Sequence, residues 1–377
     1  MFSKIKQLFQ SEAPAAVSEA QVKEHLKHCI DPNTGTDFIH DKTLKKVNIQ
    51  GGKISLEIAL GYPANSQFSA IEHLIGEHLL TLEGVTEAVV DVRSEIVSHA
   101  AQRGVALLPG VKNIIAVSSG KGGVGKSTTA VNLALALAAE GARVGILDAD
   151  IYGPSQPLMM GLQGQRPETP DGKSLIPLSQ YGIQVMSMGF LVDDDQAMVW
   201  RGPMVTQAMM QLLNDTRWDN LDYLVIDMPP GTGDIQLTLS QKVPVTGAIV
   251  VTTPQDIALL DAKKGLRMFE KVGVPVLGVV ENMSMHICSE CGHTEAIFGE
   301  GGGAKMASQY GIQLIGQLPL DLSIRLGTDA GKPSVASDPD GKVAEIYKAI
   351  ARQVAIKVAA KARDYSSRMP KIVIQNT

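Results

Sequence analysis

The chain has 377 residues, of which 44% are hydrophobic and 19% are charged, so its length favours two domains and its composition allows each to bury a core. The net charge of −5 gives no basic surface, and nucleic acid is therefore not an expected partner. No apolar run reaches the roughly 18 residues of a membrane-spanning helix, and the N-terminus lacks the apolar segment of a secretory signal, so we expect a cytoplasmic protein.

The first predicted domain covers residues 18–97 and follows a disordered leader at 1–17. Two strand-like segments flank Gly51-Gly52, which is a hairpin signal. We interpret Cys29 as a simple thiol rather than a metal ligand, because a buried free cysteine behaves as a small hydrophobic residue. The expected elements make a small α+β domain: helix 18–30, strands 43–50 and 53–60, helix 66–82 and strand 85–92.

A linker at 98–112 is expected to lead to a second domain at 113–365, which a tail at 366–377 follows. In this domain short apolar runs alternate with helical segments, a pattern that predicts an α/β fold with a mostly parallel sheet and helices on both faces. Ligands in such folds bind at the carboxyl ends of the strands. The expected strands lie at 113–119, 144–147, 183–188, 223–226, 247–252 and 276–280.

The sequence GKGGVGKS at 120–127 fits G-x-x-x-x-G-K-[ST], the loop that cradles nucleotide phosphates. The strand before it and an expected helix at 128–140 would aim backbone N–H groups and the positive end of the helix dipole at one point. Lys126 would reach the terminal phosphates, and the Ser127 hydroxyl would bind Mg²⁺. Lys121 is a second lysine in the loop and would project to solvent or to a phosphate held by a neighbouring subunit.

Carboxylates follow two of the expected strands. Asp148 and Asp150 end the strand at 144–147, and Asp227 ends the strand at 223–226. An apolar strand that ends in Asp beside a phosphate loop is the Walker B arrangement, in which the carboxylate holds Mg²⁺ for phosphoryl transfer. A single strand-end Asp could equally cap a helix. Two such strands behind one phosphate loop favour the functional interpretation.

Cys288 and Cys291 form a C-x-x-C pair, which places two thiolates within reach of one metal but cannot complete a tetrahedral site. His286 and His293 could complete a zinc site within the chain. A second chain could instead supply an equivalent pair around an iron–sulfur cluster, or the pair could be a redox dithiol. The dithiol is the weakest alternative, because the thioredoxin type lies near a βαβ turn and this loop continues into Gly292 and polar residues.

Seven stretches of the chain resemble the Mrp/ApbC family of iron–sulfur cluster carrier ATPases, which belongs to the MinD/ParA-like class with a deviant Walker A loop. They extend from the phosphate loop to a point past the C-x-x-C pair. The order of elements at 18–97, with Asp31-Pro32, resembles the MIP18-type domain that often precedes these ATPases. The matching stretches are GKGGVGKST (120–128), DADIYGPSQP (148–157), WRGPM (200–204), DYLVIDMPPGTGD (222–234), ENMS (281–284), CSECG (288–292) and FGEGGG (298–303).

The resemblance implies a homodimer that binds ATP, Mg²⁺ and a labile [4Fe–4S] cluster, hydrolyses ATP and passes the cluster to apo-proteins. It implies that Lys121 contacts nucleotide across the dimer, that Asp150 positions the attacking water and that Asn282 contacts the adenine. Cys288 and Cys291 would hold the cluster together with the same pair of the other chain. The implied nucleotide-binding loop consists of Gly120, Lys121, Gly122, Gly123, Val124, Gly125, Lys126, Ser127 and Thr128.

Two other classes of function remain as alternatives. A MinD/ParA-type switch would bind ATP and no metal; the C-x-x-C pair and the lack of a basic DNA-binding face argue against it. A nucleotide-gated zinc scaffold would keep the metal and lack transfer activity.

Overall fold

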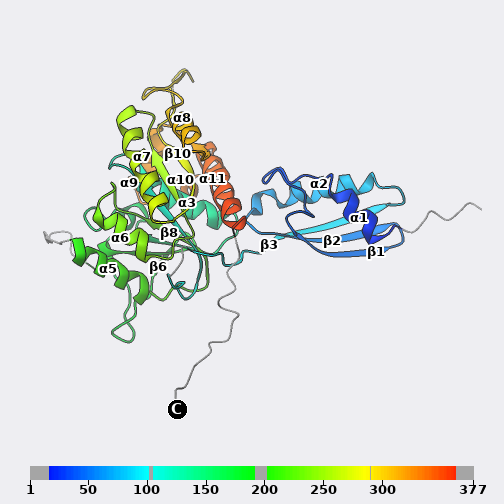
Figure 1. The fold of residues 1–377 in the computed structure, drawn as a ribbon, viewed down its shortest axis with the longest axis horizontal. Helices are drawn as coiled ribbons and strands as arrows, with labels where there is room; N and C mark the ends of the chain where they lie inside the picture. Colours follow the sequence, from blue (N-terminus) through cyan, green and yellow to red (C-terminus); the bar gives the residue numbers. More distant parts are fainter. Residues whose placement is uncertain (1–16, 102–104, 192–201, 289, 362–377) are drawn as a thin grey trace, which may run out of the picture. The chain divides into compact units, whose positions relative to one another are not determined.

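The computed structural model describes residues 17–101, 105–191, 202–288 and 290–361, and it divides into two compact units, Met1–Glu95 and Ile96–Thr377 (Figure 1). Apart from Val17, the expected leader lies outside the described residues, as does the expected tail. Trp200 and Arg201 of the WRGPM stretch also lie outside them.

The first unit is a three-stranded sheet with two main helices, in the strand order β1-β2-β3. β1 and β2 are antiparallel and joined at the predicted hairpin, whereas β2 and β3 are parallel because α2 connects them. The buried residues of α2 recur every four positions, at Ile71, Ile75 and Leu79, so one face of this helix packs on the sheet. The elements are α1 (Glu19–Leu26), β1 (Leu44–Gln50), β2 (Lys53–Leu60), α2 (Phe68–Leu80) and β3 (Glu87–Ser94).

The helix α1 is shorter than the predicted 18–30. It begins with a reciprocal capping box between Ser18 and Gln21. It ends at Leu26 because the next N–H groups, including that of Cys29, bond to carbonyls three residues back and tighten the chain into turns.

The second unit contains an eight-stranded sheet in the order β13-β10-β9-β4-β8-β5-β7-β6. Every neighbouring pair is parallel except β6 and β7, so the predicted mostly parallel sheet is confirmed. The three-residue edge strand β6 was not predicted. The strands are β4 (Val111–Ser119), β5 (Val144–Asp148), β6 (Leu178–Gln180), β7 (Ile183–Ser187), β8 (Leu221–Asp227), β9 (Gly247–Thr252), β10 (Val276–Glu281) and β13 (Leu314–Gln317).

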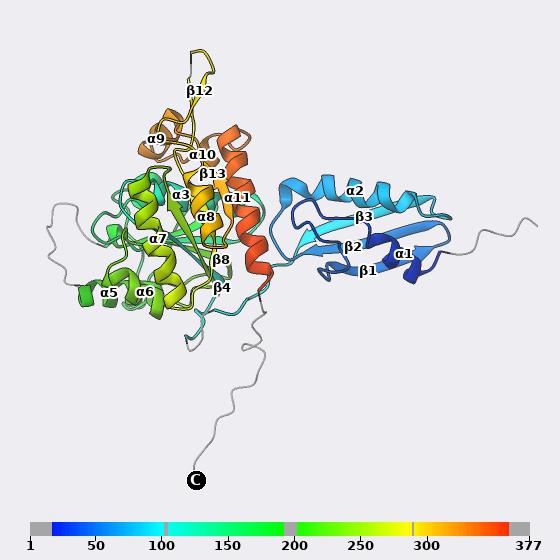
Figure 2. The same ribbon diagram turned by 45° about the horizontal axis from the view of Figure 1, so that its top comes forward.

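Helices cover both faces of this sheet. α3 and α11 pack together on one face, while α5 to α8 lie on the other (Figures 1 and 2). Every residue of β8 and β9 is buried, which explains why these strands are continuous apolar runs in the sequence. The helices are α3 (Lys126–Ala139), α4 (Gln156–Met159), α5 (Gly202–Asp215), α6 (Asp234–Lys242), α7 (Asp256–Lys271), α8 (Gly302–Gln309), α9 (Leu322–Asp329), α10 (Ser334–Ser337) and α11 (Lys342–Ala359).

Candidate functional site

The predicted phosphate loop joins β4 to α3 at the carboxyl edge of the sheet. Gly125 precedes the first turn of α3 with φ +81°, and a Cβ atom there would lie 2.1 Å from the side-chain nitrogen of Asn282. Gly120 is equally confined, because its Cβ would lie 2.1 Å from the carbonyl carbon of Asp261. A Cβ on Gly122 or Gly123 would meet nothing within 4 Å. The loop is therefore anchored at its ends and open in the middle, where a phosphate could approach its N–H groups.

Lys126 and Asp227 form a buried ion pair between the loop and the end of β8. The exposed fractions of the two side chains are 6% and 0%. The ammonium group of Lys126 also donates to the Ser127 hydroxyl at 3.2 Å. The Lys126 ammonium group thus lies between the Ser127 hydroxyl and the Asp227 carboxylate, the two groups that the sequence predicts to bind Mg²⁺.

Gln156, at the start of α4, is a member of this cluster that sequence analysis did not identify. Its side-chain nitrogen donates to Asp227 Oδ2 at 2.9 Å and to the carbonyl oxygen of Ser127 at 3.2 Å. The residue is fully buried. The stretch DADIYGPSQP contains it, but a loop glutamine carries no periodicity or metal-ligand pattern that would have marked it.

The two carboxylates that follow β5 have different surroundings. Asp148 is buried and accepts hydrogen bonds from the N–H groups of Asp150, Ser155 and Gln156, at 3.1, 2.9 and 3.0 Å. Burial, and next the negative charge of Asp227, raise the pKa of Asp148 to about 7. Asp148 therefore organises the loop at 149–156.

Asp150 is only half-buried and directly follows β5 and Ala149 in the chain. Burial raises the pKa of its carboxyl group, and the nearby charge of Lys126 acts in the opposite direction. The structure therefore places Asp150 within electrostatic reach of Lys126.

Asn282 follows β10 and braces the phosphate loop from the other side. Its side-chain nitrogen donates to the carbonyl oxygen of Val124 at 2.9 Å. Its backbone N–H donates to the carbonyl oxygen of Thr252 at 2.7 Å. The structure thus shows a loop-supporting contact for this amide, while its expected contact with adenine stays a prediction.

The loop residue Lys121 is half-buried. Its carbonyl oxygen accepts a hydrogen bond from the Ser119 hydroxyl at 2.8 Å, which fixes the backbone at the first lysine of the loop. Its expected contact with a neighbouring subunit stays a prediction.

The C-x-x-C pair lies on a hairpin formed by β11 (His286–Ile287) and β12 (Thr294–Glu295). The Cys288 N–H donates to His293 O, and the Gly292 N–H donates to Cys288 O, both at 2.9 Å. Backbone N–H groups of Cys291 and Glu290 point at the Cys288 sulfur and lower the pKa of this thiol. Cys291 is exposed. The hairpin thus carries Cys291 exposed and Cys288 half-buried near its tip, with the pKa of the Cys288 thiol lowered.

The described residues contain no group of three or more His, Cys, Asp or Glu side chains arranged to hold a metal ion. Neither His286 nor His293 therefore joins the two cysteines, and one ring nitrogen of His286 instead lies 3.1 Å from the carbonyl oxygen of Leu320. A zinc site within one chain and a cluster shared by two chains both stay predictions, which the metal content of the protein tests.

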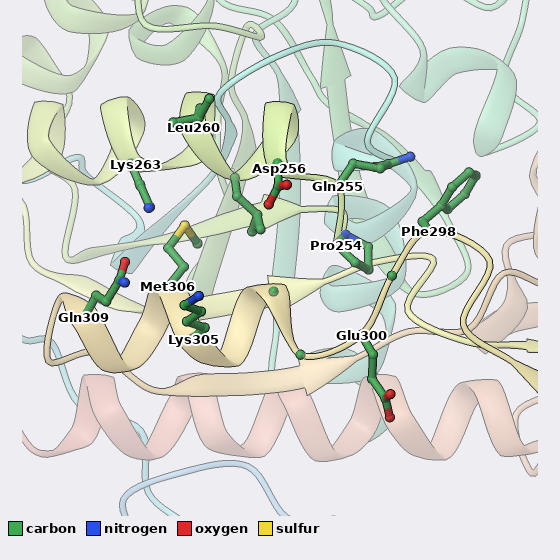
Figure 3. A pocket seen from close by; sticks show the side chains of 14 residues that line it. Pro254, Gln255, Asp256, Leu260, Lys263, Phe298, Glu300, Lys305, Met306 and Gln309 are labelled. Atoms are coloured by element: carbon green, nitrogen blue, oxygen red, sulfur yellow. The ribbon is translucent and has the colours of Figure 1, made fainter.

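A hollow of about 780 Å³ lies between α7 and α8. Figure 3 shows Lys263 of α7 on one side and Lys305 and Gln309 of α8 on the other. The loop 298–303 closes one end, and the N–H of Gly303 is bonded to the buried carboxylate of Glu281. The FGEGGG stretch therefore leads into the helix α8, which begins at Gly302.

Among the described residues, no helix combines the length and the apolar character needed to cross a membrane.

Two family models match the chain, one in each compact unit. Residues 110–355 match the model described as NUBPL iron-transfer P-loop NTPase. Residues 19–92 match the model described as iron–sulfur cluster assembly protein.

Curated relatives match over nearly the full length. The chain is 55% identical to the iron–sulfur cluster carrier protein of Salmonella typhimurium, over 93% of this chain and 94% of the relative. It is 52% identical to that of Escherichia coli K12 over the same shares, and 46% identical to that of Synechocystis over 89% and 97%. A solved nucleotide-binding protein in complex with ADP from Archaeoglobus fulgidus is 37% identical, with a TM-score of 0.55 over 63% of this chain and 93% of that one.

Proposed function

The chain belongs to the NUBPL iron-transfer P-loop NTPase family, which includes the iron–sulfur cluster carrier proteins, and we propose that it carries a labile [4Fe–4S] cluster in an ATP-dependent manner. Its partners in this proposal are a cluster donor, apo iron–sulfur proteins and a second copy of the chain. The observation that carries the proposal is the combination of a complete phosphate loop with a C-x-x-C pair on a hairpin, one thiol exposed and the other half-buried.

ATP binds at the phosphate loop in this proposal. Lys126 turns from Asp227 to the terminal phosphates, whose negative charge replaces that of the carboxylate. Ser127 and Asp227 fit Mg²⁺, because their oxygens already meet at one cation, and the metal ion would neutralise charge on the phosphates. Asp150 orients the attacking water, and Lys121 contacts the nucleotide held by the partner copy.

The cluster is the cargo, and its four sulfur ligands are Cys288 and Cys291 of two copies. One pair leaves half of such a site unfilled, and a two-fold dimer supplies the same pair again because its interface is isologous. Nucleotide bound near the interface can change the cluster geometry by moving the two copies.

Two substitutions test the ATPase part of the proposal. Lys126→Ala should lose hydrolysis and most nucleotide affinity, because the positive charge that faces the terminal phosphates is removed. Asp150→Asn should retain ATP binding and hydrolyse ATP more slowly. Unchanged turnover in Lys126→Ala, or lost ATP binding in Asp150→Asn, would contradict the assigned roles.

Light scattering tests the shared cluster. The cluster-loaded protein should have about twice the chain mass of 40.1 kDa. The Cys288→Ala variant, treated in the same way, is the control that lacks the proposed bridge. A cluster-loaded protein that is strictly monomeric would refute a cluster held by two chains.

A further inference from the structure

Gln156 is the buried group beside the phosphate loop that the proposed reaction does not use. We infer that it is a positioning residue for magnesium–nucleotide binding: its side-chain nitrogen holds the Asp227 carboxylate, and its side-chain oxygen accepts a hydrogen bond from water on the bound cation. The inference rests on the proposed ATP binding and adds a residue to that site.

The orientation of the Gln156 amide follows from its neighbours. Its side-chain nitrogen lies 2.9 Å from Asp227 Oδ2 and 3.2 Å from the Ser127 carbonyl oxygen, and both of these atoms can only accept. The group facing them must therefore be the NH₂, and Oε1 points elsewhere.

The missing partner of the Gln156 side-chain oxygen is a second observation that points to a ligand. Gln156 Oε1 is buried and has no hydrogen-bond partner among the described residues. A buried acceptor without a donor costs free energy, so a native protein retains one where a ligand or water supplies the donor. Water on a cation held by Asp227 and Ser127 would supply it within the same cluster.

The backbone of Gln156 is fixed independently of its side chain. Its N–H and that of Ser155 both donate to Asp148 Oδ2, which also accepts from the Ser187 hydroxyl at 3.2 Å. The buried carboxylate thus ties α4 to the ends of β5 and β7. The Gln156 side chain consequently approaches Asp227 from a rigid support.

Gln156 matters most when Lys126 leaves Asp227 for the phosphates. Asp227 Oδ1 then loses its cationic partner, while Oδ2 keeps the N–H of Gln156. Gln156 would thus keep the carboxylate in one orientation, and Oδ1 would be available to Mg²⁺. The two contacts of Gln156 therefore predict an effect on magnesium-dependent binding and little effect on binding without the metal.

The test compares Gln156→Met with Gln236→Met in the full chain. Gln236 is the control, because it is also buried and its Oε1 also lacks a partner among the described residues, while its side-chain nitrogen donates to Ser118. In the described residues the hydrogen bond of the Gln236 side chain goes to Ser118 and not to Asp227 or Ser127.

The measurement is the dissociation constant of a fluorescent ADP analogue, with EDTA and with millimolar Mg²⁺. Magnesium should tighten binding to the wild type and to Gln236→Met by the same factor. In Gln156→Met that factor should fall by about 5- to 30-fold, the effect of one or two hydrogen bonds, while affinity in EDTA stays close to the wild-type value.

If Gln156→Met does not fold, Gln156→Asn takes its place. The Asn amide is one methylene too short to reach both Asp227 and Ser127, so the factor by which Mg²⁺ tightens binding should again fall. Wild-type magnesium dependence in the folded variant, equal losses with and without the metal, or the same loss in Gln236→Met would overturn the inference. A wild type that binds no nucleotide would instead refute the proposed function itself.

Discussion

Replacing Lys126 by Met should strongly destabilise the nucleotide-free protein. The substitution keeps most of the aliphatic volume and removes the charge that neutralises Asp227, a carboxylate with 0% exposure. Asp148 is also buried beside this carboxylate, so two negative groups would then share one apolar region. The Gln156 N–H remains as a neutral partner for Asp227, which is weaker than a full positive charge.

The size of the effect follows from the burial of both partners. Removing one member of a buried ion pair costs about 3–5 kcal/mol, because it leaves an unpaired charge in the interior. At about 2–4 °C per kcal/mol for a domain of this size, the melting temperature of the second unit should fall by about 6–20 °C.

Differential scanning calorimetry in EDTA without nucleotide measures this loss. Lys264→Met is the surface control, because Lys264 is 66% exposed in its pair with Asp261, and it should change the melting temperature by no more than about 2 °C. The double variant Lys126→Met/Asp227→Asn should regain much of the stability, because the charges are removed together. A wild-type melting temperature in Lys126→Met would refute the reasoning. So would a double variant whose loss in melting temperature equals the sum of the losses of the two single variants.

Three further predictions follow from single groups. Because burial holds the pKa of folded Asp148 at about 7, above its ordinary value of 3.8, the contribution of this group to stability without metal should be greatest at acidic pH and be lost as the pH rises to about 7; the difference in melting temperature between the wild type and Asp148→Asn measures it. Cys288 should react with iodoacetamide much faster than Cys29, whose thiol pKa burial raises to about 11, and mass spectrometry of timed samples gives the order. Gly125→Ala should abolish nucleotide binding, because a methyl group at φ +81° would clash with Asn282. Isothermal titration calorimetry measures this loss, and wild-type affinity in the variant would contradict the loop conformation.

The fold and much of the candidate site could be predicted from the sequence because their signals are local. The phosphate loop is a contiguous pattern, and Asp227 directly follows an apolar strand, so the structure brings Lys126, Ser127 and Asp227 together as expected. They meet at the carboxyl edge of the sheet because its strands are parallel.

Features that depend on contacts between distant residues could not be predicted. Gln156 meets Asp227 across 71 positions of the chain, and no property of a loop glutamine indicates that partner. The contact of Asn282 with Val124 spans 158 positions. The edge strand β6 was missed because three residues are too few for a period to be visible.

The histidines beside the C-x-x-C pair show the same limit. Sequence spacing alone left a zinc site with His286 and His293 open, since both lie within two residues of a cysteine. The hairpin pairs His286 with Glu295, and the described residues hold no group of three or more such side chains placed to bind a metal ion, so the choice between the two metal sites is left to experiment.

The metal content of reconstituted variants tests the shared cluster most directly. After anaerobic reconstitution, the wild type should contain about two iron and two sulfide per chain, which is one [4Fe–4S] cluster per dimer. Cys288→Ala should lose nearly all of it, because symmetry removes two of the four ligands, whereas His293→Ala and Cys29→Ala should retain it. Retained cluster in Cys288→Ala, its loss in His293→Ala, or stoichiometric zinc in place of iron would contradict a cluster held by the cysteines of two chains.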